Sequence, residues 1–369
     1  MRQSIPIARP HIDRRDEQGV LKVLRSGVLA LGSQSVAFEQ GICTYTKSPY
    51  ALSVANGTCG LHVAVRALGL QDGDEVITTP FSFISSSNAL LFERAVPRFV
   101  DIEPTTLNLD PAKLEKAITK RTKAIMVVHI FGQTTDMTPV LKIAREHKLR
   151  VIEDACESLG ATYKGRMAGT FGDIGVYAFY PNKQMTTGEG GMMVMKTKAH
   201  YELCKSLKNQ GRNPAGDWLI HERLGYNYRL DEMSASLGVT QLKKLDWMIK
   251  KKAQLVRWYE QAFAALKDER VVLPQVGPHR THSWFVYVVR ITNGRRNGVM
   301  AQLAKQQIQT KPYLPVIHLQ PFMREQFGYK VGDYPVAEQL ASETLALPFF
   351  IGLTKADISR VAQEVVQAL

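Results

Sequence analysis

A lysine and an aspartate stand near the ends of two apolar segments of this sequence. Lys183 lies within residues 175–191, which finish with Thr-Thr-Gly-Glu-Gly-Gly, and Asp154 ends the apolar segment 150–154. A pyridoxal phosphate (PLP) enzyme requires such a pair, because the amine forms a Schiff base and the carboxylate keeps the pyridine nitrogen protonated. Taken alone, the two residues are explained equally well as a surface lysine in a glycine-rich turn and an aspartate that caps a helix.

Residues 56–60, with the sequence Asn-Gly-Thr-Cys-Gly, could bind the phosphate of such a cofactor. They lie between a predicted strand and a predicted helix, where free backbone N–H groups and the positive end of the helix dipole attract an anion. The hydroxyl of Thr58 could cap the helix or contact a phosphate oxygen, and capping alone is the simpler interpretation. Phe83 follows the next predicted strand, where its ring could stack on a flat cofactor or belong to the hydrophobic core.

The positions of these residues relative to the predicted strands favour a functional site. Asp154 ends an apolar strand, and open α/β sheets bind ligands outside the carboxyl ends of their parallel strands. A carboxylate there can accept a hydrogen bond from a pyridinium N–H group. Glu153 is expected to point to the other face of the strand in a structural role. Lys183 is therefore better explained as a Schiff-base lysine and proton shuttle than as a solvated charge.

Between residues 50 and 155 the sequence alternates short apolar segments with longer amphipathic ones. This rhythm predicts a βαβ sheet with helices on both faces. The apolar residues at 125–128 and 151–152 do not alternate with polar ones, as expected for strands that are covered on both sides. The predicted strands are 50–54, 75–79, 96–100, 124–129 and 150–153, and the predicted helices are 58–68, 83–94, 111–118 and 138–147.

The rest of the chain is expected to add an N-terminal segment and a smaller domain. Residues 1–245 are predicted to form this segment and the large domain, and residues 246–369 a small C-terminal domain, because the chain exceeds one typical domain length. One long helix over 231–266 would link them. Helices near 13–26 and 33–45 are expected to pack against the large domain or a partner subunit. The other predicted strands are 176–180, 192–195 and 283–292, and the other helices are 200–209, 299–306, 337–345 and 355–369.

The composition is that of a soluble globular protein. Of the 369 residues, 45% are hydrophobic and 22% are charged. The first residues lack the apolar core of a signal peptide and no segment approaches the length of a membrane span, so a cytoplasmic location without a membrane partner is expected. The sequence has no C-x-x-C pair, so neither a metal site nor a disulfide framework is predicted from its cysteines, which are Cys43, Cys59, Cys156 and Cys204.

The net charge of +13 raises the question of a nucleic-acid partner. The positive charges are scattered, and the one modest cluster has helical spacing with apolar residues between its members. A solvated helix face is therefore expected there, and no nucleic-acid partner. A positive field would also attract an anionic small substrate. The cluster comprises Lys243, Lys244, Lys250, Lys251, Lys252 and Arg257.

Taken together, these segments resemble the DegT/DnrJ/EryC1/StrS family, the sugar aminotransferases of PLP fold type I. The resemblance extends over essentially the whole chain. Its most specific part is Pro-Asn-Lys at 181–183 followed by Gly-Glu-Gly-Gly at 188–191. The resemblance implies an α/β large domain with a mostly parallel central sheet flanked by helices, and a smaller α+β C-terminal domain. Further matching segments are 26–39, 56–58, 129–133, 153–157, 226–242, 315–318 and 347–348.

The resemblance also implies a role for each matching residue of the site. Lys183 would be the Schiff-base lysine, and Asp154 would be the partner of the pyridine nitrogen. Phe83 would stack on the cofactor ring, and Glu157 would contact the ring hydroxyl or the substrate. The implied phosphate contacts are Gly57, Thr58 and, from the neighbouring subunit, Asn227, and the implied substrate contacts are Glu157, Tyr313 and His318.

One residue of this chain departs from the family pattern. Many members have a serine two residues after the position of Val176 that donates to the phosphate, and this chain has Ala178. One phosphate contact is therefore missing, or a backbone N–H group or a water molecule supplies it. Lys183 argues against the dehydratase branch of the family, in which histidine replaces the lysine. A transcriptional regulator would need a DNA-binding element, and the sequence contains no convincing helix-turn-helix motif.

The resemblance implies a homodimeric PLP-dependent aminotransferase with shared active sites. It would move an amino group from L-glutamate, by way of pyridoxamine phosphate, to a keto group of a nucleotide-linked deoxy sugar. Glu157 favours amination at C4 over C3. Loops such as 210–220 and the C-terminal domain are expected to select the substrate. Two alternatives remain open: an aminotransferase for another carbonyl substrate such as a cyclitol, and a cofactor-binding regulatory protein.

Overall fold

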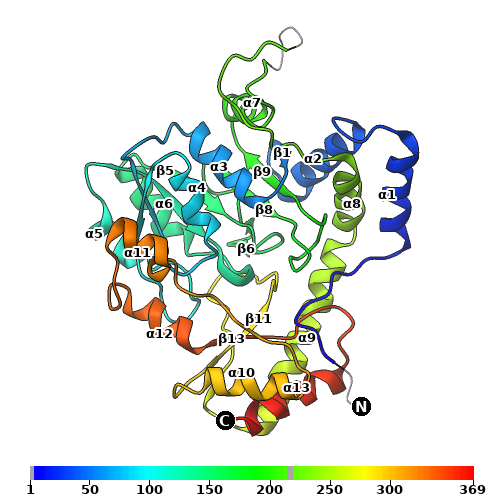
Figure 1. Cartoon of the computed structure of the whole chain (residues 1–369), viewed down its shortest axis with the longest axis vertical. Helices are drawn as coiled ribbons and strands as arrows, with labels where there is room; N and C mark the ends of the chain where they lie inside the picture. The colour runs from blue at the N-terminus through cyan, green and yellow to red at the C-terminus, as the bar shows by residue number, and fades with distance from the viewer. Residues whose placement is uncertain (1–3, 214–218) are drawn as a thin grey trace.

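A seven-stranded sheet forms the centre of the computed structural model, which describes residues 4–213 and 219–369 (Figure 1). The strand order is β1-β9-β8-β5-β4-β2-β3. Strand β9 is antiparallel to both of its neighbours, whereas the pairs from β8 to β3 are parallel, so the predicted mostly parallel sheet is confirmed. The bounds are β1 Tyr50–Val54, β2 Glu75–Thr78, β3 Val96–Phe99, β4 Thr122–Val128, β5 Arg150–Asp154, β8 Ile174–Ala178 and β9 Gly191–Met195.

Helices cover both faces of this sheet because its central strands are apolar on both sides. In β4, Met126 packs into the core on one face and Val127 into the core on the other. Successive side chains of a strand point to opposite faces, so an unbroken apolar segment supplies two cores at once. The covering helices are α3 (Gly57–Ala67), α4 (Ser85–Leu91) and α7 (Lys198–Leu207) on the first face, and α5 (Leu114–Ala117) and α6 (Met137–Glu146) on the second.

The two N-terminal helices pack against the large sheet unit, as expected. Helices α1 (Arg14–Ser26) and α2 (Ser33–Thr46) both contact α8 (Glu232–Leu242), and α2 also contacts β1. The residues before α1 follow a different course. The N–H of Ile5 donates to the carbonyl of Gln307 at 2.9 Å, so the beginning of the described chain adjoins the C-terminal part.

The single long helix expected over 231–266 is two helices in the structure. Helix α8 ends at Leu242, and α9 spans Leu245–Leu266. Lys244 lies at the break, where its Nζ contacts carboxylate oxygens of Asp13 at 2.8 Å and Asp16 at 2.5 Å. Asp16 is almost fully buried on α1, and the ion pair with Lys244 compensates for the burial of its carboxylate. Lys244 thus makes these tertiary contacts at the break, and the helical pattern of the sequence does not reveal them.

A four-stranded sheet with the order β10-β11-β13-β12 lies beside the C-terminal helices, below the large sheet in Figure 1. The helix expected over 337–345 ends at Glu343, and its last part belongs to strand β13 instead. Helix α9 begins at Leu245, near the proposed domain boundary, and this division into 1–245 and 246–369 stays a prediction. The bounds are β10 Val271–Val272, β11 Tyr287–Ile291, β12 Lys311–Pro312, β13 Thr344–Leu347, α10 Arg296–Lys305, α11 Pro321–Phe327, α12 Pro335–Glu343 and α13 Lys355–Gln367.

Short elements complete the described chain. A two-stranded hairpin of β6 and β7 follows the carboxyl end of β5, and three 3-10 turns lie in connecting segments. Within residues 4–213 and 219–369, no helix is both long and apolar enough to cross a bilayer. The bounds are β6 Thr162–Tyr163, β7 Arg166–Met167, η1 Pro111–Lys113, η2 Ile130–Gly132 and η3 Ile317–Leu319.

Candidate active site

A cavity of about 520 Å³ lies at the carboxyl ends of the parallel strands, where ligands of α/β sheets bind. The segments that follow β1, β2, β5 and β8 form most of its wall. The cavity contains nearly all the residues that were expected to bind a cofactor. The lining residues used below are Asn56, Gly57, Thr58, Phe83, Ser85, Asp154, Cys156, Glu157, Ala178, Lys183 and Tyr313.

Asp154 ends β5 and presents its carboxylate at this cavity. Its Oδ2 accepts a 2.7 Å hydrogen bond from Ser86 Oγ, and its Oδ1 accepts a 3.2 Å bond from the N–H of Cys156. Both donors fix the orientation of the carboxylate. The structure therefore places an oriented, buried carboxylate where the sequence predicted a partner for a ring nitrogen.

Glu153 points to the opposite face of β5, as the alternation of a strand requires. Its Oε2 lies 2.8 Å from Nε2 of His129 and also accepts a 2.8 Å bond from the N–H of Gly169. Its other oxygen accepts from the N–H of Gly172. These contacts lower the pKa of Glu153 against the opposing effect of burial. Glu153 is thus a structural residue that joins β4 and β5 to the 169–172 segment.

Lys183 lies in the turn after β8, and its side chain enters the cavity. Its Nζ is 3.4 Å from Oε1 of Glu157 and 4.0 Å from the ring centroid of Phe285. The second oxygen of Glu157 accepts a 2.9 Å bond from the N–H of Phe131, which orients the carboxylate. Burial raises the pKa of Glu157, while the Lys183 charge opposes this rise. The amine is thus held between an aromatic face and a carboxylate.

The turn at residues 56–60 begins α3 at the same cavity. Asn56, rather than Thr58, caps the helix, because its side-chain oxygen accepts a 2.9 Å bond from the N–H of Cys59. The Thr58 hydroxyl lies 2.7 Å from Ser85 Oγ on the next cavity segment. Two hydroxyls and the start of a helix therefore converge here, and this donor set suits a phosphate group.

Gly57 allows the close approach that this arrangement requires. A Cβ at this position would lie 2.9 Å from the Cβ of Ala178 and 2.9 Å from Sγ of Cys156. Both distances are shorter than real Cβ contacts, so the backbone of α3 can approach β8 and the segment after β5 only without a side chain. Together with the cavity volume, Asp154 and Lys183, this closely placed turn fits a phosphorylated pyridine cofactor.

The remaining predicted site residues differ in where they lie. Phe83 is 60% exposed and lines the cavity, and Tyr313 lines it from the C-terminal part of the chain. Asn227 is exposed and is not among the residues that line the cavity of its own chain. His318 is fully buried beside Glu338, with its Nε2 3.0 Å from Oε1, and it does not line the cavity. The structure thus brings Phe83 and Tyr313 to the site, but not His318.

Sequence reasoning missed Ser86 and Ser85, which orient the site through Asp154 and Thr58. The only signal was the Ser-Ser-Ser sequence at 85–87, two residues after Phe83 and inside a predicted helix. Hydroxyls at the start of a helix usually cap it, so their side-chain partners could not be foreseen. The loop 210–220, which was expected to help select the substrate, lies partly outside the described residues, because 214–218 are not described.

The prediction that the lysine cluster forms a solvated helix face is wrong for Lys252 and Lys244. Lys252 on α9 is 6% exposed, and its Nζ donates to the carbonyl of Phe285 at 3.4 Å. Burial, with a contribution from the positive charge of Lys183, lowers the pKa of Lys252 to about 7. Lys244 forms ion pairs with the carboxylates of Asp13 and Asp16 at the break between α8 and α9. Helical spacing could not show that Lys252 on α9 and Lys244 just before it contact other elements.

The model of the DegT/DnrJ/EryC1/StrS aminotransferase family matches residues 10–366. The chain belongs to this family. GDP-perosamine synthase from Caulobacter vibrioides is 37% identical over 369 residues, with 99% of this chain and 98% of the relative covered. PseC from Helicobacter pylori, an aminotransferase involved in the biosynthesis of pseudoaminic acid, has a TM-score of 0.93 at 26% identity and 99% coverage of both chains. DesV from S. venezuelae has a TM-score of 0.92 at 30% identity, with 99% and 98% coverage.

Members of the DegT/DnrJ/EryC1/StrS family are PLP-dependent aminotransferases, and this chain is one of them. The cavity fits that chemistry in its own residues. Lys183 would offer the amine and Asp154 an oriented carboxylate to such a cofactor. The donors at Gly57, Thr58 and Ser85 are arranged for a phosphate. The expected serine contact is absent, because Ala178 lines the cavity at that position.

Proposed function

We propose that this aminotransferase transfers an amino group from L-glutamate to a keto group of a nucleotide-linked deoxy sugar, with C4 favoured over C3. The observation that carries the proposal is that Lys183, Glu157 and Asp154 line the same cavity, with Lys183 Nζ 3.4 Å from Glu157 Oε1. The name of the Caulobacter relative, GDP-perosamine synthase, supports a nucleotide sugar as the acceptor. The net charge of +13 suits a diphosphate-bearing substrate.

The residues of this chain would act in distinct ways. When bound, PLP supplies an electron sink for the bond that breaks at the carbon bearing the amine. Asp154 would hold a proton on the pyridine nitrogen, and Lys183 would attach the cofactor and then carry the transferred proton. Phe83 would cover the flat ring. Glu157 would orient Lys183 and contact the ring hydroxyl or the substrate, and Tyr313 would contact the substrate.

We also propose that the working form is a homodimer. Asn227, for which the family resemblance implies a phosphate contact, is exposed and does not line its own cavity, and this supports a contact with the cofactor of another copy. Large apolar side chains are also exposed on α1 and the segment after it, and a second copy would cover them. These residues are Leu21, Leu24, Val28, Leu29 and Leu31.

The absorption spectrum of the protein loaded with PLP, before and after the addition of L-glutamate, tests the reaction. We expect the band of the lysine-bound cofactor to disappear and the pyridoxamine phosphate band to appear. A panel of keto acceptors, with and without a nucleoside diphosphate, then tests the substrate. Regeneration of the first band by 4-keto nucleotide sugars would support the proposal, whereas regeneration by free cyclitol ketones would support the alternative substrate class.

Two other outcomes would overturn the proposal. A lysine-bound cofactor that does not respond to any amino donor would favour a regulatory protein that binds PLP. The absence of a lysine-bound band would mean that Lys183 does not attach the cofactor. The Lys183→Ala variant is the control, because it removes the amine that forms the bond and leaves the other cavity residues in place.

A further inference from the structure

A polar cluster outside the cavity joins helix α3 and the turn after α4 to the segment that carries Asn227. His62 on α3 is buried, with its Nε2 2.9 Å from Oε1 of Glu93 and its Nδ1 3.1 Å from the hydroxyl of Tyr228. Tyr226 donates to the same Glu93 oxygen at 2.6 Å, and Arg66 donates to the other at 2.9 Å. The functions assigned so far explain none of these four contacts.

When His62 is neutral, both of its ring nitrogens, the Glu93 carboxylate and the two tyrosine hydroxyls each have a hydrogen-bond partner. Burial lowers the pKa of His62 against the opposing effect of Glu93. The neutral ring then donates from Nε2 to the Glu93 carboxylate and accepts at Nδ1 from the Tyr228 hydroxyl. A buried network in which every group has a partner holds one geometry, because any other geometry leaves a polar group unpaired.

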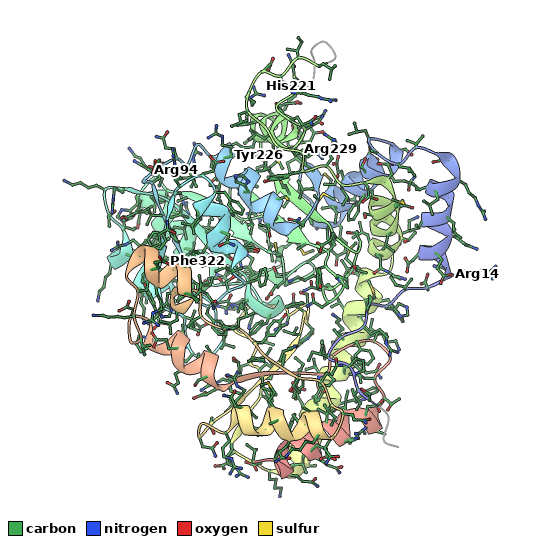
Figure 2. The ribbon with its side chains drawn as sticks, viewed as in Figure 1. Arg14, Arg94, His221, Tyr226, Arg229 and Phe322 are labelled. Atoms are coloured by element: carbon green, nitrogen blue, oxygen red, sulfur yellow. The ribbon has the colours of Figure 1, made fainter. Side chains whose placement is uncertain are left out.

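Asn227 forms an isolated antiparallel bridge with Asn209, so the segment 226–228 is extended and its side chains alternate. The rings of Tyr226 and Tyr228 stack with centroids 5.0 Å apart, and both pack on the ring of His62. Asn227 lies between them in sequence and is exposed. Since neighbouring side chains of an extended chain point to opposite sides, the two rings that face α3 turn Asn227 outward. Figure 2 shows Tyr226 and Arg229 at the base of the projecting segment, with His221 farther out.

Backbone bonds fix the same segment at both ends. The N–H of Tyr226 donates to the carbonyl of Leu207 at 2.6 Å, and the N–H of Tyr228 donates to that of Lys208 at 2.9 Å. The carbonyl of Tyr228 accepts a 2.9 Å bond from the N–H of Ala55, which directly precedes the phosphate turn. The position of Asn227 is therefore set by α3, the turn after α4 and the end of α7 of its own chain.

We propose that His62 and Glu93 are positioning residues for the active site of the second copy in the dimer, because they hold Tyr226 and Tyr228 so that Asn227 is presented to that copy's cofactor phosphate. This inference rests on the proposed homodimer. A hydrogen bond to a charged phosphate depends strongly on placement, so release of the 226–228 segment weakens cofactor binding in the partner. His62 itself contacts neither the cofactor nor the substrate.

Mixed dimers with a single intact Lys183 test this inference. In one arrangement, His62→Ala and Lys183→Ala are on the same subunit, so the remaining lysine faces an Asn227 whose support is lost. In the other arrangement, the two substitutions are on different subunits, so the remaining lysine faces an intact Asn227 support. Borohydride reduction after titration with PLP fixes the cofactor only on the subunit with Lys183, and mass spectrometry then measures its occupancy.

We expect the same-subunit arrangement to bind PLP about tenfold more weakly than a mixed dimer of Lys183→Ala and unchanged subunits. The different-subunit arrangement should match that reference dimer. A loss in the different-subunit arrangement alone, or an equal loss in both, would overturn the inference, because His62 would then act through α3 of its own site. Equal binding in all three dimers would overturn it as well.

Two further measurements protect the test from a folding defect and from failure of the dimer. Tyr226→Phe removes only the hydroxyl that binds Glu93, keeps the stacked ring, and should show the same arrangement dependence to a smaller extent. His147→Ala replaces an exposed histidine at the end of α6 and should have no effect in either arrangement. Size-exclusion chromatography reports whether the protein is a dimer. A monomeric active protein would overturn both the proposed homodimer and the role of His62. A dimer in which only the different-subunit arrangement loses PLP binding would overturn the role of His62 alone.

Discussion

Ser86 Oγ donates a 2.7 Å hydrogen bond to Oδ2 of Asp154, and both side chains are buried at the carboxyl edge of the large sheet. Ser82 Oγ lies 2.7 Å from Ser86 Oγ, so two hydroxyls lead to the carboxylate. Because the Ser86 hydroxyl fixes the orientation of the Asp154 carboxylate, the segment after β2 positions the residue that ends β5.

Substitution of Ser86 should reduce catalysis without removing the cofactor. Ser86→Ala removes a hydrogen bond to a charged group, and we expect kcat to fall about tenfold while the lysine-bound cofactor is retained. Steady-state kinetics and the absorption spectrum measure the two effects. Ser87→Ala is the matched control, because the buried Ser87 hydroxyl has no hydrogen-bond partner among the described residues. An equal loss in both variants would show that the Ser86 hydroxyl has no special role.

Gly57→Ala should weaken cofactor binding and lower the stability of the fold. The added Cβ would lie 2.9 Å from both the Cβ of Ala178 and Sγ of Cys156, so α3 must move away from the cavity. We expect the free energy of unfolding in urea to fall by about 1–3 kcal/mol. Gly298→Ala on α10 is the control, because its Cβ would meet nothing within 4 Å. Partial recovery in the Gly57→Ala, Ala178→Gly double variant would identify the clash as the cause.

Ala178→Ser should tighten PLP binding, because it places a hydroxyl on the cavity wall where the family pattern has one. One added hydrogen bond corresponds to a dissociation constant that is about five- to tenfold lower. Titration of the protein with PLP, followed by the absorbance of the lysine-bound form, measures the change. Ala178→Gly alters the size of the side chain without adding a donor and should not tighten binding. If the serine variant binds no better than the alanine protein, another group already supplies this contact.

Lys252 should make the stability of the cofactor-free protein depend on pH. Its pKa is lowered from 10.5 to about 7 by burial, so the unfolded chain binds one more proton between these values. The free energy of unfolding therefore rises with pH in this window, by about 1 kcal/mol per pH unit. This gain in the free energy of unfolding is complete only above 10.5, the pKa of the lysine in the unfolded chain, and it is lost as the pH falls to about 7.

Lys252→Met isolates the pH-dependent contribution of Lys252, because methionine is also unbranched but has no group that titrates. Urea unfolding at several pH values from 7 to 10 should show the unchanged protein gaining stability relative to the variant. Lys251→Met, on the neighbouring exposed position of α9, should show no such trend. Parallel pH profiles for the unchanged protein and Lys252→Met would contradict the assignment of a neutral buried lysine.

The sequence by itself identified the two residues that we propose for the chemistry. Lys183 and Asp154 follow apolar strands, and in a parallel sheet the carboxyl ends of such strands meet at one edge, so their proximity could be predicted without coordinates. The alternating apolar and amphipathic segments likewise predicted the sheet with helices on both faces. Both inferences depend on local pattern and on rules of connection that hold for the whole fold class.

Only the tertiary structure decided how these residues are supported. The bond from Ser86 to Asp154 spans 68 positions of the chain, and the bond from Lys244 to Asp16 spans 228. Burial of Lys252 and of His318 also depends on segments far away in sequence. Local patterns specify which face of an element is apolar, but the partner of a polar group is set by packing between distant segments, and this packing exists only in the folded chain.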